Sequence, residues 1–480
     1  MLKAFFKDSA IYTLPSLVSR GLSFFLFPLY TQVLSPTDYG AFDILVVFGN
    51  LITLTVALEI SQGVARYYTE EQDPDKKIVY ASTSFWFSLV CYFLFMVFSL
   101  IFSTTLTGWL LDDKSWSGIF QLYTLHIFLY GLFCLIQNQF RWEFRSKTYA
   151  LISIIVTLTT AGVSVYLAYF LKWGIHGILY GLISGSFVGC VYGLWNLRST
   201  YQLKFDSSYL KKMITFSAPL IPSSIAVFMS LYIDRLMINH YLSLEEVGIY
   251  GIGYRLASIV GLLMIGFKGA LTPLIYNNYN KKNTPKDLAV IFRYFSAAAL
   301  MIFLGLSIFS KEILTIITTP AYIPASQVVI YLIPAVFFSN MYVFAPGITI
   351  TKKTHFLIYI NMGGALVNFL LNLVLIPRYG ISGAAIATFI GYGFVFGVHM
   401  IISQKLYFVP HKWKQLVLAI GVFGLIAGFG LTMDSDYRFN FLIKLGILIM
   451  TIPLVVLLKL ILKKEVVQVY VFVKHRFFSK

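Results

Sequence analysis

The chain has 480 residues, of which 58% are hydrophobic, 17% aromatic and only 12% charged, and its mean hydropathy is +0.78. A soluble domain carries about 25% charged residues, so half that share cannot cover a water-soluble protein of this length. With 3 cysteines and 34 glycines, the composition also excludes disorder, a collagen-like fibre and a disulfide scaffold. The remaining class is an all-α polytopic membrane protein.

Apolar runs of about 20 residues, separated by short polar breaks, predict about 14 transmembrane helices. The first run, 10–33, is too long for a cleavable signal, whose apolar core has about 7–15 residues, so we expect it to be the first membrane helix. The following runs are 41–66, 79–102, 117–140, 149–171, 175–197, 213–241, 247–276, 288–310, 325–350, 356–376, 381–404, 413–432 and 439–462.

The net charge is +17, from 37 Lys and Arg against 20 Asp and Glu. If the N-terminus lies in the cytoplasm and the spans alternate, 25 basic residues fall in cytoplasmic segments, 5 in outer loops and 7 within or at the ends of spans. This bias follows the positive-inside rule. It predicts that both termini are cytoplasmic, and it explains the basic balance without a nucleic-acid partner.

The sequence contains an internal repeat. Residues 34–44 align with 242–252 at an offset of 208, and residues 172–177 align with 378–383 at an offset of 206. We call these two aligned pairs the first and the second repeat anchor. Because they lie far apart and their offsets differ by only two residues, they predict two repeats of six helices each. An even number of spans gives both copies the same orientation, as in transporters that rock two lobes, although a duplication without alternating access is the alternative.

The repeat divides the chain into four expected parts. They are an N-terminal six-helix lobe at 1–200, a C-terminal six-helix lobe at 209–405, two appended transmembrane helices within 406–462, and a basic cytoplasmic tail at 463–480.

Polar side chains mark one face of the first span and of its repeat equivalent, the seventh. Each face carries serines and one arginine, and intramembrane charge at about 2.5–3.5 kcal/mol per residue indicates function. We therefore expect both faces to line a cavity between the lobes. The residues are Ser9, Ser16, Arg20 and Ser23 in the first span and Ser217, Ser224 and Arg235 in the seventh.

Two carboxylates lie within the predicted spans. Glu59 is two turns from Arg66, too far for a comfortable direct pair. Proton or ion coupling and a structural bridge to Arg20 are equally good interpretations of Glu59. Asp234 is the second candidate for coupling, and a structural pairing with Arg255 is the favoured interpretation of that residue.

A further polar face lies on the eleventh span and carries Asn361, Asn368 and Asn372. Hydrogen bonding between helices is slightly favoured there over a cavity lining. Cys91, Cys134 and Cys190 lie in apolar stretches without metal-ligand spacing, which indicates packing and predicts no metal. No phosphate-binding Gly-Lys-Ser/Thr loop, HExxH or GxSxG motif is present, so we expect neither an enzyme nor a cofactor.

Three stretches together resemble the Wzx-type oligosaccharide flippases of the multidrug/oligosaccharidyl-lipid/polysaccharide exporter superfamily. The first is LSPTDYGAFD at 34–43 with VARYY at 64–68. The second is DR at 234–235 with EVGIY at 246–250 and YRL at 254–256. The third is NLVLIPRYGISGAAIAT at 372–388, so the resemblance covers essentially the whole chain.

The resemblance implies a flippase in the bacterial cytoplasmic (inner) membrane that works by alternating access. It would move undecaprenyl-diphosphate-linked oligosaccharide units to the outer leaflet for O-antigen of lipopolysaccharide, capsule or another surface polysaccharide. Membrane lipids surround such a protein, and a polysaccharide polymerase or the chain-length machinery is an expected partner. The outward movement of an anion is downhill by about 2.3 kcal/mol per charge per 100 mV, and proton or sodium coupling through Glu59 or Asp234 remains open.

Guanidinium groups bind phosphate oxygens through charge-assisted hydrogen bonds, so arginines suit a diphosphate while serines and asparagines suit sugar hydroxyls. A multidrug or organic-cation exporter of the same superfamily is the alternative, and it predicts an acidic cavity. A membrane acyl- or glycosyltransferase would need a catalytic histidine or paired acids, but His126, His240 and His399 are isolated. The expected substrate-binding residues are Arg20, Arg235, Arg255, Ser16, Ser23, Ser224, Asn368 and Asn372.

Overall fold

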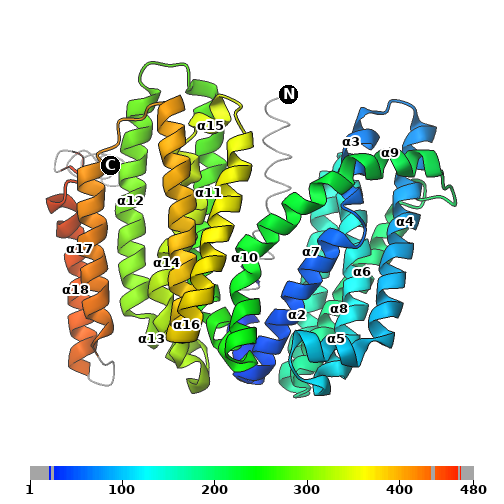
Figure 1. The fold of residues 1–480 in the computed structure, drawn as a ribbon, viewed down its shortest axis with the longest axis horizontal. Coiled ribbons are helices and arrows are strands. Elements are labelled where there is room, and N and C mark those ends of the chain that lie inside the picture. Colours follow the sequence, from blue (N-terminus) through cyan, green and yellow to red (C-terminus); the bar gives the residue numbers. More distant parts are fainter. Residues whose placement is uncertain (1–20, 23–25, 434–437, 463–464, 466–480) are drawn as a thin grey trace, which may run out of the picture. The chain divides into compact units, whose positions relative to one another are not determined.

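The structure is a computed structural model, and it describes residues 21–22, 26–433, 438–462 and 465. The chain divides into two compact units, Met1–Ile249 and Tyr250–Lys480, which are described separately (Figure 1). The described residues form helices and connecting turns, with no strand among them. Ser9, Ser16, Arg20 and Ser23 of the first predicted span lie outside the described residues.

The first unit is a helix bundle in which α6 and α7 pack against α8, and α4 packs against α6. Its helices are α2 (Pro36–Thr55), α3 (Ile60–Glu70), α4 (Pro74–Ile101), α5 (Ser103–Leu110), η1 (Lys114–Trp116), α6 (Ser117–Trp142), α7 (Ser146–Ser164), η2 (Val165–Phe170), α8 (Gly174–Asn196), α9 (Ser207–Ser217), η3 (Ala218–Leu220), α10 (Ile221–Tyr241) and the first turns of α11 (Leu244–Asn278).

The second unit is a bundle in which α14 packs against α16 and α12 packs against α14, α17 and α18. Its helices are the remainder of α11, α12 (Thr284–Ile308), α13 (Ser310–Ile317), η4 (Pro320–Ala325), α14 (Ser326–Asn340), η5 (Met341–Phe344), α15 (Gly347–Ile350), α16 (His355–Leu406), α17 (Trp413–Leu431) and α18 (Arg438–Leu457).

The all-helical membrane fold predicted from the sequence is confirmed. In the part of the chain that the structure describes, 12 helices are long and apolar enough to cross a membrane. One of them, the 52-residue α16, contains two predicted spans, 356–376 and 381–404, and has non-helical backbone angles at Gly380 between them. The first predicted span lies largely outside the described residues.

The second repeat anchor has the same backbone geometry in both copies. Gly174 and Gly380 have φ values of +54° and +58°, a left-handed conformation that suits glycine. Three residues later, a Cβ on Gly177 would lie 2.4 Å from the backbone nitrogen of Ala168, and one on Gly383 would lie 2.2 Å from the Leu375 carbonyl oxygen. In both copies, a helix therefore begins after a tight reversal that only small residues permit. The lobe boundaries inferred from the repeat remain a prediction.

The first repeat anchor starts two equivalent helices with equivalent caps. Ser35 and Asp38 form a capping box at α2, in which Ser35 Oγ accepts from the Asp38 N–H at 3.1 Å. At the start of α11, Ser243 Oγ accepts from the Glu246 N–H at 3.2 Å. Both caps satisfy a backbone donor that the helix itself leaves unpaired.

The two equivalent helix starts also touch each other, within the first unit. A Cβ on Gly40 would lie 1.7 Å from the Leu244 carbonyl oxygen, and a Cβ on Gly248 would lie 2.0 Å from the Pro36 carbonyl oxygen. The contact is reciprocal, because the offset of 208 relates Gly40 to Gly248 and Pro36 to Leu244. Each backbone approaches so closely that neither position has room for a side chain.

The connection between α8 and α9, residues 197–206, is held along the side of α4. Ser82 Oγ donates to the Thr200 carbonyl oxygen at 3.1 Å and accepts from the Gln202 N–H at 2.9 Å. Trp86 Nε1 donates to the Gln202 carbonyl oxygen at 2.9 Å. The Asp206 N–H donates to Thr83 Oγ1 at 3.1 Å, so the connection meets α4 at three side chains.

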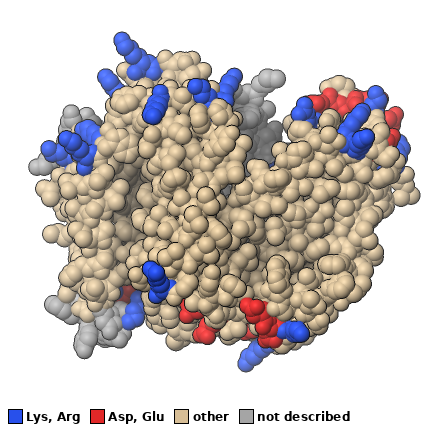
Figure 2. Space-filling view, viewed as in Figure 1, with Lys and Arg blue, Asp and Glu red and all other residues tan. Residues whose placement is uncertain are grey.

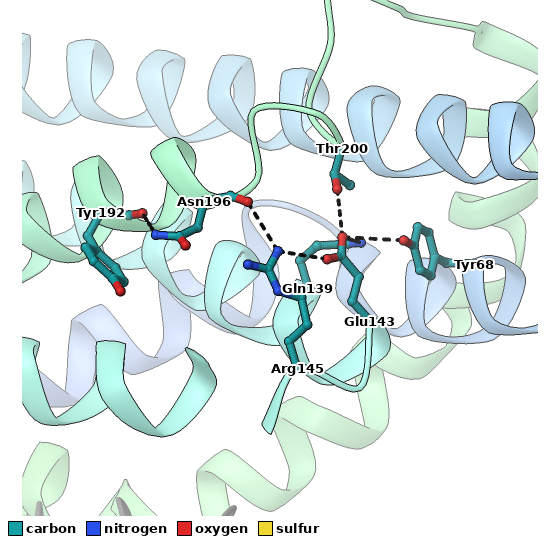
Figure 3. Close-up of polar contacts among 7 residues, drawn as sticks. All are labelled: Tyr68, Gln139, Glu143, Arg145, Tyr192, Asn196 and Thr200. Atoms are coloured by element: carbon teal, nitrogen blue, oxygen red, sulfur yellow. Dashed lines mark hydrogen bonds and ion pairs between the residues drawn. The ribbon is translucent and has the colours of Figure 1, made fainter. Parts of the chain in front are cut away.

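The carboxylate of Glu143, just after α6, fixes the same connection (Figure 3). Thr200 Oγ1 donates to Glu143 Oε1 at 2.8 Å, and Gln139 Nε2 donates to the same oxygen at 3.1 Å. Arg145 Nη1 lies 3.3 Å from Glu143 Oε2. Burial beside this carboxylate raises the pKa of Tyr68 to about 12. These contacts determine where α9, and thus the start of α10, meets the rest of the unit.

The reciprocal glycine contact leads to a stability prediction. Gly40→Ala should lower the thermal midpoint of the purified protein in detergent, because overpacking a tight contact costs about 1–3 kcal/mol. Gly162→Ala in α7 is the matched control, since a Cβ at Gly162 meets nothing within 4 Å. The control should keep or raise the midpoint, because alanine favours a helix over glycine by about 0.5–1 kcal/mol. Equal midpoints for the two variants would contradict the close approach.

Candidate functional site

The single transmembrane helix predicted over residues 41–66 is interrupted in the structure. α2 ends at Thr55 and α3 begins at Ile60, and between them Leu58 and Glu59 both have φ of +52°. Left-handed conformations cost a residue with a side chain about 1–3 kcal/mol each and persist where the surroundings hold them. The Glu59 side chain makes no capping hydrogen bond to α3. A strained break within a predicted membrane span is a feature typical of transporter binding sites.

The serines of the seventh span meet this break. Ser217 Oγ at the end of α9 donates to the Leu58 carbonyl oxygen at 2.7 Å, and Ser224 Oγ in α10 donates to Glu59 Oε1 at 2.6 Å. Ser217 is fully buried, and Pro219 follows it in η3, where α9 gives way to α10. Ser217 thus satisfies a backbone carbonyl in the break, and Ser224 gives the Glu59 carboxylate a hydrogen-bond donor.

The charged residue predicted in the seventh span has a counter-ion on α2. Arg235 Nε lies 2.6 Å from Asp43 Oδ2, and the exposed fractions of the two side chains are 6% and 14%. The Arg235 guanidinium also lies 5.7 Å from the centre of the Tyr232 ring. Pairing in this way reduces the large free-energy cost of burying either charge alone.

A third contact lies between the other two along α2 and α10. Asn50 Nδ2 donates to the Tyr232 hydroxyl oxygen at 3.3 Å. The contacts of α2 and the break with α10 thus run from Asp43–Arg235 through Asn50–Tyr232 to Glu59–Ser224, as expected for two antiparallel helices. We call these six residues the α2–α10 seam.

The charged residues of the α2–α10 seam differ in their partners. The Asp43–Arg235 pair is internally neutralised, whereas Glu59 forms no ion pair with any described residue and accepts a hydrogen bond from a neutral hydroxyl. A carboxylate of this kind can accept a proton or approach a cation without first losing a salt bridge. Arg235 must leave Asp43, or share it, before its Nε can bind a phosphate oxygen.

A cavity of about 240 Å³ lies beside α2 inside the first unit. His126 is buried there, with Nδ1 3.3 Å from Ser186 Oγ, so the isolated histidine of the sequence has a polar partner on α8. Asn50 lines the cavity and also contacts α10 across the seam. The other polar and aromatic residues that line it are Phe42, Thr53, Tyr123, Tyr130 and Thr160.

The remaining predicted site residues lie elsewhere. Asn368 and Asn372 are buried in α16, where Asn372 Nδ2 donates to Asn368 Oδ1 at 3.1 Å, while Asn361 is exposed. Asp234 is buried in α10, and Arg255 is half-buried in α11 of the second unit. Arg20, Ser16 and Ser23 lie outside the described residues, so the predicted bridge from Arg20 to Glu59 is not tested.

Two elements of the site were not predicted from the sequence. Asp43 is the counter-ion of Arg235, and the need to neutralise an intramembrane arginine is a signal that points to an acidic residue on a neighbouring span. The helix break at Leu58–Glu59 carries no glycine or proline at the break itself, so no local signal marks it. Among the described residues, no group of three or more His, Cys, Asp or Glu side chains could hold a metal ion.

These features define a class: a many-spanning helical membrane protein with a broken helix and paired charges inside its spans. The chain belongs to the polysaccharide biosynthesis protein family, whose sequence profile matches residues 30–327. This match confirms the resemblance predicted from the sequence.

One named relative is similar to this chain in sequence, and two solved structures are similar to it in fold. The chain is 21% identical over 424 residues to the "Probable low-salt glycan biosynthesis flippase Agl15" of Haloferax volcanii, covering 86% of this chain and 87% of that one. Its fold is similar to that of the lipid II flippase MurJ in an inward closed conformation, with a TM-score of 0.72, 16% identity, and coverage of 93% and 98%. An inward-facing multidrug resistance transporter of the MATE family follows with a TM-score of 0.61, 13% identity, and coverage of 84% and 96%.

The buried ion pair leads to a prediction about stability. Asp43→Asn should lower the thermal midpoint strongly, because removing one partner of a buried pair costs about 3–5 kcal/mol. The double variant Asp43→Asn/Arg235→Gln should recover part of this loss, since neither charge then remains. Glu70→Gln is the control: it removes the exposed pair with Arg66, whose side chains are 50% and 64% exposed, and should change little. A midpoint for Asp43→Asn no lower than that of the control would contradict a stabilising pair at Arg235.

Proposed function

We propose that the chain is a flippase that moves a lipid-linked oligosaccharide, carried on undecaprenyl diphosphate, from the cytoplasmic to the outer leaflet of a bacterial inner membrane. The observation that carries the proposal is the family match over residues 30–327, together with the similarity to a glycan biosynthesis flippase over 86% of the chain. The likeness in fold to a lipid II flippase is consistent with it. The product would serve O-antigen, capsule or related polymer synthesis, with a polymerase or chain-length protein as a partner.

The α2–α10 seam suggests how a diphosphate would be handled. The Arg235 guanidinium lies beside Asp43. A diphosphate would replace the Asp43 carboxylate and accept two charge-assisted hydrogen bonds from this guanidinium. Exchange of one anion for another avoids leaving a buried guanidinium uncompensated at any step. Arg20 and Arg255 complete the proposed set of cations, and Ser16, Ser23, Asn368 and Asn372 are the proposed contacts to sugar hydroxyls.

We further propose that Glu59 couples transport to a proton or a sodium ion. Its carboxylate faces a single neutral hydroxyl at Ser224, and the nearby Leu58 carbonyl oxygen belongs to the helix break. A carboxylate next to unwound backbone is a combination that binds protons and small cations in membrane transporters. Alternating access would then make and break the contacts of this region, with both termini staying in the cytoplasm.

Substrate identity can be tested in a strain that lacks the gene. We expect lipid-linked oligosaccharide to accumulate on the cytoplasmic leaflet, wild type to clear it, and Arg235→Ala and Arg20→Ala at normal abundance to clear it at least about tenfold more slowly, as loss of a charged contact implies. Arg66→Ala is the control, because Arg66 pairs with Glu70 at an exposed position. Unchanged surface glycan with raised sensitivity to cationic drugs would favour the multidrug exporter instead.

Coupling can be tested with purified protein in liposomes. Wild-type flipping should respond to an imposed proton or sodium gradient, and Glu59→Gln, which keeps a hydrogen-bond acceptor for Ser224, should lose that response while still flipping slowly. Asp234→Asn is the parallel variant for the second candidate carboxylate. A gradient response in Glu59→Gln equal to that of wild type would remove Glu59 from the coupling mechanism.

A further inference from the structure

A second polar cavity lies in the second unit, far along the chain from the seam. It has a volume of about 280 Å³ and is formed by the first turns of α12, the segment that enters α17, and the residues that follow α18. The proposed flippase mechanism uses none of its residues. The polar residues that line it are Lys286, Arg293, His411, Lys412, Gln415 and Glu465.

Positive charge dominates this cavity. Lys286 and Lys412 are exposed at its rim, and Arg293 is buried in its wall. Arg293 contacts Glu465 Oε1 at 2.5 Å and the Lys459 carbonyl oxygen at 3.5 Å, which occupies two of its five N–H donors. Glu465 therefore offsets one of three cations, and the others have no ion pair with any described residue. Figure 2 shows Lys and Arg side chains gathered at this end of the second unit.

The start of α17 adds backbone donors to the same cavity. Its cap residue, Lys412, provides no side-chain hydrogen bond to the helix, although the first N–H groups of a helix lack helical partners. A helix start without a capping side chain, together with the partial positive charge of the helix dipole, favours an anion. Lys412 thus contributes both an ammonium group and the position at which the helix begins.

Two side chains of the lining hold buried polar atoms that no described residue satisfies. They are both ring nitrogens of His411 and Oε1 of Gln415. The His411 ring is held between Phe292 and Trp413, with ring centres 4.6 and 5.2 Å away, so it is fixed in place. Burial lowers the pKa of His411 to about 4, which leaves a neutral imidazole with one N–H to donate at neutral pH.

The geometry points to a binding site for a phosphate-bearing anion in this cavity, supplied by the headgroup of an anionic membrane lipid or by free phosphate. Two ammonium groups, a guanidinium, an imidazole N–H and the open start of α17 are the donors that such a group requires. The neighbouring Trp413 is 41% exposed, and tryptophan marks the level of lipid headgroups in membrane proteins. Basic pockets between helices on the cytoplasmic side hold lipid headgroups elsewhere.

Occupation of the site would join the appended helices to the rest of the unit. Its lining comes from α12, the entry to α17, and the residues that follow α18, so a bound phosphate would contact three segments at once. This consequence is independent of the proposed function, because it concerns stability and lipid preference and not the transported molecule.

The test measures the thermal midpoint of the full-length protein in detergent, titrated with phosphatidylglycerol, phosphatidylcholine of the same chain length, or inorganic phosphate. Phosphatidylglycerol should raise the midpoint at concentrations at which phosphatidylcholine does not. Lys286→Gln/Lys412→Gln should shift the titration by roughly tenfold or more, since each cation near lipid phosphate contributes about 1 kcal/mol. The matched control is Lys352→Gln/Lys353→Gln, which removes two exposed lysines outside the cavity.

The outcomes separate the two sources. A stabilisation by inorganic phosphate that needs Lys286 and Lys412 would support the site with a soluble occupant, whereas stabilisation by phosphatidylglycerol alone would support a lipid. If neither phosphatidylglycerol nor inorganic phosphate stabilised wild type more than the Lys286/Lys412 variant, the proposal would be overturned, as it would by an equal loss in the control variant. Neither result depends on flipping activity.

Discussion

The scarcity of water around membrane-spanning helices is the constraint on which this structure depends. Every charge or unpaired backbone group in a span must find a protein partner, because hydrocarbon offers none. Asp43 meets that need for Arg235, and Ser217 meets it for the Leu58 carbonyl oxygen in the break between α2 and α3. The same requirement places the functional candidates together, since the residues that break the apolar pattern must contact one another.

Charge pairing also explains the polar contacts outside the seam. In the second unit, Lys444 is nearly fully buried in α18, and its Nζ lies 2.6 Å from Glu312 Oε1 on α13. In the first unit, the Glu143 carboxylate, just after α6, contacts donors on Gln139, Arg145 and Thr200. These residues hold one helix against another, whereas Glu59 has a neutral partner at a strained position. Glu59 therefore differs from these structural carboxylates in the kind of partner it has.

Much of the fold follows from the sequence alone, because length and hydropathy determine which segments can cross a membrane. The α16 region shows the strength of the approach: two runs separated by Gly380 are two predicted spans, and the backbone bends there. The break after Thr55 shows its limit. Neither Leu58 nor Glu59 is a residue type that favours a positive φ, and their left-handed conformation depends on contacts with α9 and α10, which follow about 160 residues later.

The sequence identifies several residues of the candidate site but not all of their contact partners. Ser217, Ser224, Arg235 and Glu59 can be selected by their polarity within spans, and the structure places all four along one line of contacts. The partner of Arg235 could not be selected, because Asp43 lies near the end of a predicted span, where a carboxylate is inexpensive. Asn368 and Asn372 are buried and bond to each other within α16, and a bond inside one helix tests neither the interhelical interpretation nor the cavity lining.

The reciprocal contact of Gly40 and Gly248 has a consequence for the origin of the chain. A contact in which each of two equivalent segments presents the same surface to the other is the kind that joins identical subunits in a symmetric dimer. An ancestor with a single repeat would have carried one such glycine and could have paired with a second copy of itself through it. Duplication would then have converted an association between molecules into a permanent contact within one chain, in which a side chain at either glycine would meet the backbone of the other segment.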